Sequence, residues 1–321
     1  MDLSGKRILV IGGAGFIGSH TVDLLLKENI KELLIYDNLM RGSKKNIENA
    51  LKDNRVSFIS AADILDYPKL LKWTLNSDAV LHFAALWLNH CINDPRYALE
   101  VNIKGTFNVI QACKEASIEK LIFSSSASVY GDTNKSLIDE DTLLQSKNFY
   151  GATKISCEAL MRSFFYQHNL NYLGLRYMNV YGPRQDYKGR YVSVILKMLD
   201  AIDRDRAPTI FGNGNDTYDF ISVEDCAMAN ICALKSNKSN QFYNVGTGIK
   251  TSLKELAQNL IKIRNKNLLI NYIENKESYI DRDRVGDILK AKKELKFQSK
   301  ISLDEGLKRL IKWRDNDLNL I

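Results

Sequence analysis

Tyr150 and Lys154 stand four residues apart in a stretch whose apolar spacing predicts a helix. Residues at this separation share one helix face, so the phenol and the ammonium group are expected to lie side by side. A free tyrosine, with a pKa of about 10, is a poor base at neutral pH, but a neighbouring cation favours its phenolate. Tyr150 is therefore a candidate general base.

A run of hydroxyl side chains supports this interpretation, because a tyrosine and a lysine four residues apart are common on helix surfaces. The segment from Phe123 to Gly131 reads Phe-Ser-Ser-Ser-Ala-Ser-Val-Tyr-Gly and ends a predicted strand in serines. Parallel α/β sheets build their active sites at the carboxyl ends of strands. We expect the run to lie near Tyr150, although hydrogen bonding at the strand end explains Ser124 and Ser125 equally well.

A glycine-rich turn follows the first predicted strand and opens a helix, with glycines at 12, 15 and 18. Glycine permits the tight turn and the close approach of a pyrophosphate, whose charge then faces the helix N-terminus. The next strand ends at Asp37, where a carboxylate can accept hydrogen bonds from an adenosine ribose. The pattern predicts a dinucleotide site and favours NAD over NADP, although Arg41 stands close to Asp37. The positive nicotinamide ring of NAD would further favour the Tyr150 phenolate.

The first half of the chain alternates short apolar runs with longer amphipathic stretches, which is typical of βαβ units and a parallel sheet. We expect helices at 19–28, 97–115 and 150–168, and strands at 7–11, 32–36, 56–59, 79–83, 120–123 and 172–176. From about residue 179 the pattern loosens. This predicts an α/β fold, with a Rossmann-type doubly wound parallel sheet over 1–178 and a smaller, less regular C-terminal domain over 179–321. Part of about 220–245 is expected to return to the first domain.

Composition is typical of a globular protein: 321 residues, 45% hydrophobic and 26% charged. No apolar run reaches the ~20 residues that span a membrane, and no signal-peptide layout precedes the first strand, so we expect a cytoplasmic protein. The net charge of +7 fits an anionic ligand, a nucleic acid or solubility alone. Five scattered cysteines and four histidines predict free thiols, with neither a disulfide framework nor a metal site.

The ordered motifs resemble those of the extended short-chain dehydrogenases/reductases of the NAD-dependent epimerase/dehydratase family, similar to UDP-glucose 4-epimerases. The resemblance covers essentially the whole chain and implies that 179–321 form a C-terminal α+β substrate-binding domain. It is carried by Gly12 to Gly18, Asp37 to Leu39, Asp63 with Ile64, His82 to Ala85, Asn102 with Gly105 and Thr106, Ser124 to Gly131, Tyr150 with Lys154, and Arg176 to Arg184.

The resemblance implies three groups of functional residues. The catalytic group is Ser126, Tyr150 and Lys154, in which Ser126 relays the proton of the sugar 4-hydroxyl to Tyr150 and Lys154 holds the nicotinamide ribose. The implied NAD contacts are Gly12, Gly15, Phe16, Ile17, Gly18, Asp37, Asn38, Asp63, Ile64, Ala84, Ala85, Asn102, Ser124, Tyr150, Lys154 and Tyr177. The candidate contacts of the nucleotide sugar are Trp87, Ser126, Ser128, Tyr150, Asn179, Arg190, Phe211, Tyr218 and Arg284.

The residues after Ser126 bear on the reaction. Dehydratases and decarboxylases of the family carry an acidic residue one or two positions beyond the catalytic serine or threonine, where this chain has Ala127 and Ser128. Reversible oxidation at C4 remains: Tyr150 takes the hydroxyl proton, NAD accepts the hydride and a 4-keto sugar forms. Return of the hydride to the other face makes a 4-epimerase, which we favour. Release of the keto sugar makes a 4-dehydrogenase, and a non-catalytic binder of nucleic acid or protein is a third alternative.

The chain also departs from the family pattern. The family places an arginine that grips the substrate diphosphate where this chain has Tyr218, and the candidates to replace it are Arg184, Arg190, Arg282 and Arg284. Trp87 and His90 either shape the sugar pocket or pack in the core. The helices expected at 97–115 and 150–168 correspond to those that pair in dimeric relatives, so the resemblance implies a homodimer.

Overall fold

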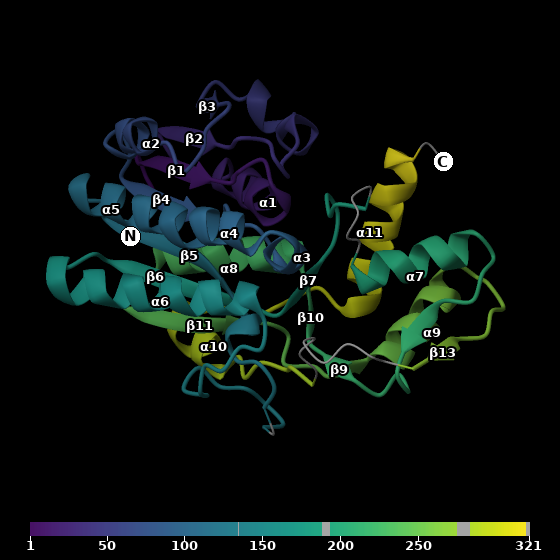
Figure 1. Ribbon diagram of the computed structural model, residues 1–321. Helices are drawn as coiled ribbons and strands as arrows, with labels where there is room; N and C mark the ends of the chain where they lie inside the picture. Colours follow the sequence, from purple (N-terminus) through teal and green to yellow (C-terminus); the bar gives the residue numbers. More distant parts are fainter. Residues whose placement is uncertain (134, 188–192, 275–282, 319–321) are drawn as a thin grey trace.

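The computed structural model describes residues 1–133, 135–187, 193–274 and 283–318. Its main element is a seven-stranded sheet in which every pair of neighbouring strands is parallel (Figure 1). In spatial order the strands are β11 (Gln241–Val245), β6 (Tyr172–Tyr177), β5 (Lys120–Ser126), β4 (Ala79–His82), β1 (Arg7–Ile11), β2 (Glu32–Tyr36) and β3 (Val56–Ile59). The predicted α/β, Rossmann-type fold class is confirmed.

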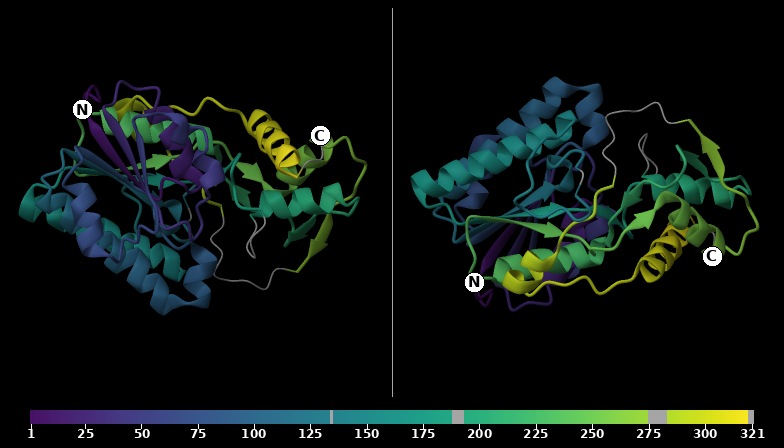
Figure 2. Two further views of the ribbon diagram at one scale, coloured as in Figure 1. Left: turned by 90° about the horizontal axis from the view of Figure 1, so that it is seen from above. Right: turned by 90° about the horizontal axis from the view of Figure 1, so that it is seen from below.

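Helices cover both faces of this sheet (Figures 1 and 2). One face packs against α1 (Phe16–Leu25), α8 (Val223–Lys235) and α10 (Leu289–Leu295). The other packs against α2 (Tyr67–Thr74), α5 (Thr106–Glu115) and α6 (Phe149–His168). The strands are largely buried on both sides, except for the edge strand β3, in which only Ile59 is buried. Among the described helices, none combines the length and the apolar character that a membrane crossing needs.

A smaller lobe lies beyond the carboxyl ends of the strands and has its own apolar core (Figure 2). Its helices are α7 (Val194–Asp203), α9 (Leu253–Ile263) and α11 (Leu303–Asp317). Three short strand pairs complete it or connect it to the sheet: β7 (Asn179–Tyr181) with β10 (Phe220–Ser222), β8 (Thr209–Phe211) with β13 (Asn271–Ile273), and β9 (Thr217–Tyr218) with β12 (Thr251–Ser252).

Several segments differ from the expected elements. Residues 95–115 form α4 (Pro95–Ala98), a π-helical stretch (Leu99–Gly105) and then α5, instead of one regular helix from 97. The short helix α3 (Leu88–Asn93) precedes them, and 3-10 turns occupy Lys44–Ile47, Ala50–Lys52 and Ala127–Val129. The segment of α10 packs on β11 and α8, although only residues near 220–245 were expected to return to the sheet. The division at 178/179 stays a prediction.

Candidate active site

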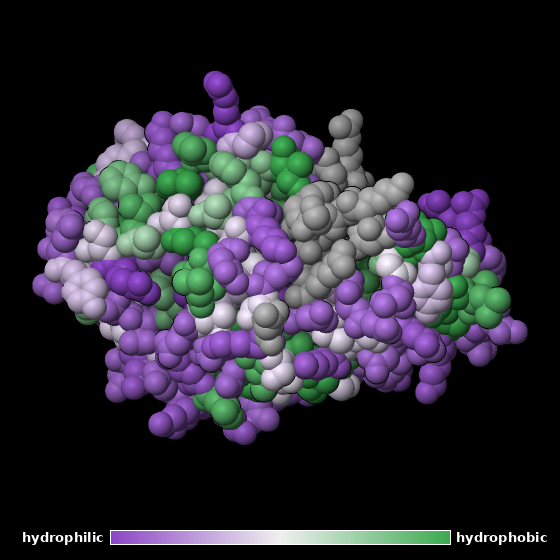
Figure 3. Space-filling model, turned by 60° about the horizontal axis from the view of Figure 1, so that its bottom comes forward, coloured by the Kyte–Doolittle hydropathy of each residue, from purple (hydrophilic) through white to green (hydrophobic). Residues whose placement is uncertain are grey.

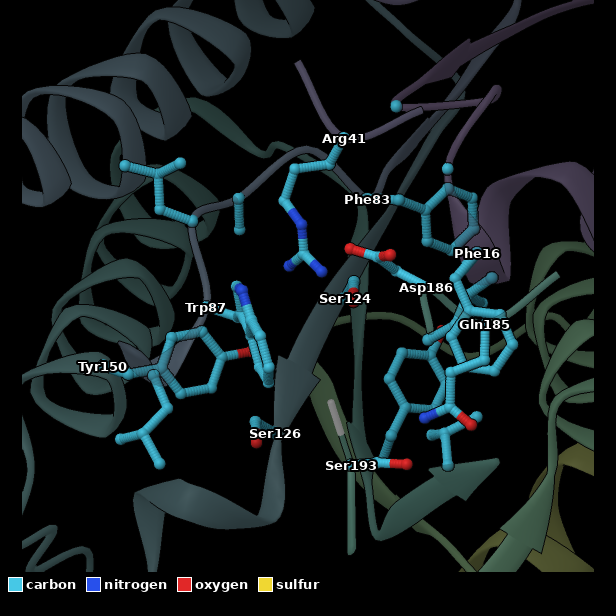
Figure 4. Close-up of a pocket in the computed structure, with 18 of the residues that line it drawn as sticks. Phe16, Arg41, Phe83, Trp87, Ser124, Ser126, Tyr150, Gln185, Asp186 and Ser193 are labelled. Atoms are coloured by element: carbon cyan, nitrogen blue, oxygen red, sulfur yellow. The ribbon is translucent and has the colours of Figure 1, made fainter. Parts of the chain in front are cut away.

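A cavity of about 780 Å³ lies between the carboxyl edge of the sheet and the smaller lobe (Figure 4). Its lining brings together nearly all the residues expected to contact cofactor or substrate, from Gly12 on the first loop to Arg284 in the C-terminal part. Asn102 is an exception, because it does not belong to this lining. Arg190 and Arg282 lie outside the described residues. A volume of this size suits a ligand much larger than a monosaccharide.

The glycine-rich loop forms one end of the cavity and leaves no room for side chains. A Cβ atom on Gly12 would lie 2.7 Å from the backbone nitrogen of Ala84, and one on Gly18 would overlap the Gly12 carbonyl oxygen. Gly15 is the N-cap of α1 and offers no side chain to the first helical N–H groups. These donors and the positive end of the helix therefore fit a dinucleotide diphosphate.

Asp37 follows β2 beside this loop and is 6% exposed. Its carboxylate accepts hydrogen bonds from the backbone nitrogens of Ala14, at 2.9 Å, and Leu39, at 2.7 Å. Burial raises the pKa of Asp37, and these two donors act in the opposite direction. The backbone thus fixes the carboxylate at the cavity wall, where it fits a ribose hydroxyl. Arg41 turns away toward Trp87 (Figure 4).

Tyr150 lies in the first turn of α6, whose N-terminus is capped by the Asn148 side chain accepting from Gly151 N at 2.9 Å. Burial raises the pKa of Tyr150 to about 12, whereas the side chain of Ser126 favours the ionised form. Ser126 Oγ accepts a hydrogen bond from Ser128 N at 3.1 Å, so its own proton remains available to donate toward the phenol or a ligand. Ser126 and Tyr150 line the same cavity wall (Figure 4).

Lys154 lies one turn further along α6 and is buried. Its Nζ donates to the Ser124 carbonyl oxygen at 2.7 Å and lies 4.9 Å from the Phe123 ring centroid and 5.7 Å from that of Tyr150. Burial lowers the pKa of Lys154 to about 8, so the ammonium is still the major form at neutral pH. The predicted pairing of cation and phenol is present in the structure.

A buried ion pair anchors the next turn of α6 to the sheet. Glu158 accepts from Arg176 Nη2 at 2.7 Å and Nε at 3.0 Å, and both side chains are 3% exposed. Glu158 also accepts from Ser125 Oγ at 2.6 Å, and Arg176 Nη1 donates to Tyr130 Oη at 2.9 Å. Ser125 therefore forms a structural hydrogen bond at the end of the strand, which was one of the two interpretations of this residue. The network as a whole fixes α6 against β5 and β6.

Asn102 lies behind the cavity wall, 2% exposed. Its amide accepts from Leu86 N at 2.7 Å and donates to Leu86 O at 2.8 Å and Thr153 Oγ1 at 3.2 Å. Asn102 therefore links the loop after β4, at Leu86, to α6, at Thr153, and it does not line the cavity. Tyr177 does line the cavity, but its hydroxyl is engaged with Asn230 Oδ1 at 2.7 Å.

The substrate side of the cavity combines residues of both lobes. Arg284 reaches across to Ser128, with Nη1 and Oγ separated by 3.4 Å, and is bridged to Tyr218 through the backbone. Asn179 lines the wall at the start of β7. Phe211 is 53% exposed at the end of β8, where it presents a flat apolar surface. Arg284 thus brings a positive charge to the cavity wall beside Tyr218.

Other candidates are placed differently. Arg184 lines the cavity as well, but its guanidinium is paired with Asp23 of α1 at 2.6 Å. Trp87 lines the cavity, while His90 contacts the Trp87 ring, with centroids 6.3 Å apart, and is not in the lining. The lining also contains polar residues that no motif indicated: Arg41, Gln185, Asp186, Ser193 and Lys197. They come from loops and from α7, whose course the periodicity of the sequence does not predict.

Known proteins resemble the chain over nearly its full length. It is 36% identical to a putative UDP-glucose 4-epimerase of Methanocaldococcus jannaschii, over 97% of this chain and 99% of that protein. A dTDP-D-glucose 4,6-dehydratase of Bos taurus is 33% identical, over 98% and 90% of the two chains.

Solved structures show the same relationship. The UDP-N-acetylglucosamine 4-epimerase from Methanobrevibacter ruminantium M1, in complex with UDP-N-acetylmuramic acid, superposes with a TM-score of 0.91 at 32% identity, covering 98% of this chain and 99% of that one. The UDP-glucuronic acid 4-epimerase from Bacillus cereus, in complex with UDP-glucuronic acid and NAD, gives 0.88 at 29%, covering 97% and 99%. Residues 8–246 match the model of the NAD dependent epimerase/dehydratase family, and the chain belongs to that family.

Proposed function

We propose that this enzyme inverts C4 of a nucleoside-diphosphate sugar through a transient 4-keto sugar. The family and the relatives establish a nucleotide-sugar enzyme of the 4-epimerase type with NAD as cofactor, so the non-catalytic alternative is not retained. The observation that carries the proposal is the meeting of Tyr150, Ser126 and Lys154 in one cavity that also fits a dinucleotide at its glycine-rich end. The residue roles that follow are part of the proposal.

The protein's own groups handle the proton and the orientation of the sugar. When bound, NAD supplies reversible hydride exchange with C4. Tyr150 Oη receives the proton of the 4-hydroxyl, directly or through Ser126 Oγ, and later returns it. Lys154 stabilises the phenolate by its charge, and Arg284 binds the substrate diphosphate near Ser128.

The neutral residues after Ser126 favour epimerisation over dehydration. Elimination of water across C5 and C6 needs an additional acid–base group near the reacting carbons. Ala127 is buried and has no ionisable group, and Ser128 is within hydrogen-bond distance of Arg284. The alternative of a 4-dehydrogenase uses the same residues and differs only in release of the keto sugar.

Product analysis separates these reactions. Purified enzyme is incubated with UDP-glucose, UDP-glucuronic acid, UDP-N-acetylglucosamine and dTDP-glucose, while NADH absorbance is followed and products are identified by NMR. We expect a C4 epimer of at least one substrate without stoichiometric NADH. Stoichiometric NADH with a 4-keto product would support the dehydrogenase instead, and a 4-keto-6-deoxy product would identify a dehydratase.

We further propose that the active form is a homodimer that pairs α5 and α6 with a second copy. These two helices pack side by side and expose large apolar side chains, with Phe107 40% and Tyr166 72% exposed. Leu99, on the adjoining π-helical stretch, is 46% exposed. Hydrophobic side chains gather on the larger lobe in the space-filling view (Figure 3). Contact with a second copy would remove this apolar surface from water.

Light scattering after gel filtration measures the mass directly. The chain has a mass of 36.6 kDa, and we expect twice that value in solution. Phe107→Asp is expected to shift the population to monomers, because the charge would be buried at the interface. Leu289→Asp, at a 67% exposed site on α10 behind the opposite face of the sheet, is the control that keeps the dimer. A monomeric wild type would contradict the proposal.

A further inference from the structure

Arg41 extends from the loop after β2 into the cavity, although its neighbour Asp37 lies at the cofactor end. Figure 4 shows its side chain directed between Trp87 and Asp186. The guanidinium carbon lies 4.7 Å from the Trp87 ring centroid, a cation–π contact that fixes the position of the charged group. Arg41 is therefore held at the part of the cavity that Trp87 and Tyr150 line.

The hydrogen-bonding capacity of this guanidinium is unused. Within the part of the chain that the structure describes, Arg41 donates no hydrogen bond and has no carboxylate within 4.0 Å. Its neighbours in the same lining contrast with it, because Lys154 donates to Ser124 O and Arg184 is paired with Asp23. A guanidinium carries five donors in a planar fork that matches a carboxylate or a phosphate. A cation with free donors at the wall of the cavity is a suitable receptor for an anion.

The position of Arg41 relative to Tyr150 indicates which part of a ligand it meets. Both side chains point toward the Trp87 ring in Figure 4, and the positive charge of Arg41 favours the ionised form of Tyr150 against the effect of burial. The charged or titratable groups that face this region include Lys154, His90 and Asp186. Under the proposed function, C4 of the sugar lies at Tyr150. A substituent on C3 or C5 of that sugar can then reach toward Arg41.

We infer that Arg41 is a carboxylate-binding residue of the sugar pocket, and that the substrates are acidic nucleotide sugars with a carboxylate on a substituent next to C4. This inference rests on the proposed function and adds the substrate class to it. A uronic acid carries such a carboxylate on C5, and a lactyl ether carries one on the oxygen of C3. Two related structures hold sugars of these kinds, UDP-glucuronic acid and UDP-N-acetylmuramic acid.

Asp186 makes the site at Arg41 selective for a well-placed carboxylate. Partial desolvation lowers the pKa of Arg41, and the negative charge of Asp186, which attracts Arg41 across the cavity, acts in the opposite direction. A bound carboxylate approaches the guanidinium edge in competition with Asp186, so binding requires good geometry and not charge alone. A neutral hydroxymethyl group in the same place would gain only ordinary hydrogen bonds.

Two substrate pairs that differ by one carboxylate test the inference: UDP-glucose with UDP-glucuronic acid, and UDP-N-acetylglucosamine with UDP-N-acetylmuramic acid. In the wild type we expect the higher kcat/KM for an acidic member. Arg41→Gln is expected to lower that value about 10- to 100-fold, mainly through KM, and to leave neutral members within about twofold. Arg41→Lys retains part of the preference, because the charge stays while the planar fork is lost.

Controls separate this role from others. Arg206→Gln removes an exposed arginine outside the cavity lining and is expected to change nothing. NAD affinity, titrated separately, is expected to be equal in wild type and Arg41→Gln. The inference would be overturned if Arg41→Gln bound NAD more weakly and lost kcat/KM equally for acidic and neutral sugars. It would also be overturned if the wild type had the higher kcat/KM for the neutral members. Failure of every sugar nucleotide to react would instead reject the proposed function.

Discussion

Tyr150→Phe is expected to lower kcat about 100- to 10,000-fold, because the proton acceptor for the 4-hydroxyl is lost while the ring remains. Tyr150 lines the cavity, and the substitution removes only its hydroxyl oxygen, so no larger space is left behind. The variant should therefore fold normally and still bind NAD. Turnover is measured by NMR of the product, and NAD affinity is measured by isothermal titration.

Tyr166→Phe provides the matched control, because Tyr166 belongs to the same helix but is 72% exposed and outside the cavity lining. It should retain wild-type turnover, because the aromatic ring that the proposed dimer would cover is kept. Wild-type activity in Tyr150→Phe would overturn the catalytic assignment. Loss of NAD binding together with activity would point to a role of the phenol in holding the cofactor instead of in proton transfer.

Glu158→Ala is expected to lower the free energy of unfolding by about 3–5 kcal/mol, because it leaves the buried Arg176 guanidinium without its anion. Both side chains are 3% exposed, and two hydrogen bonds join them. The same substitution releases Ser125, which donates to Glu158. Urea unfolding at neutral pH, with the m-value compared, gives the difference.

An exposed pair of the same charge type is the control. Glu100 and Lys104 are joined at 2.7 Å at i and i+4, with side chains 45% and 60% exposed. Glu100→Ala should cost at most about 0.5 kcal/mol, because solvent screens the pair. Equal losses in the two variants would show that burial does not set the strength of the Glu158–Arg176 pair.

The glycine-rich loop and the placement of Tyr150 beside Lys154 were predictable because local sequence encodes them. A strand, a glycine turn and a helix are consecutive, so Gly12, Gly15 and Gly18 identify the loop without tertiary information. Tyr150 and Lys154 share a helix face by spacing alone. The serine run was expected near Tyr150 because its strand, β5, ends in hydroxyls at the edge where such folds bind ligands, whereas the choice of Ser126 within the run came from the resemblance.

The rest depends on contacts between distant segments. Arg41 was noted only as a neighbour of Asp37, since nothing in its local sequence shows that the side chain crosses to Trp87. Asn102 was assigned to the cofactor by resemblance, but the π-helical stretch turns it inward to bind the loop at Leu86. Similarly, α10 is a short and weakly patterned segment whose place on β11 is decided by packing.

The central claim is inversion at C4 by removal and return of the same hydrogen. Its most direct test uses UDP-glucose and UDP-glucuronic acid deuterated at C4, incubated with the enzyme in ordinary water. The account predicts that the C4 epimer formed retains the deuterium at C4, because the hydrogen never exchanges with solvent. Loss of the label from C4 of the epimer, or accumulation of an unreduced 4-keto sugar as the end product, would contradict it.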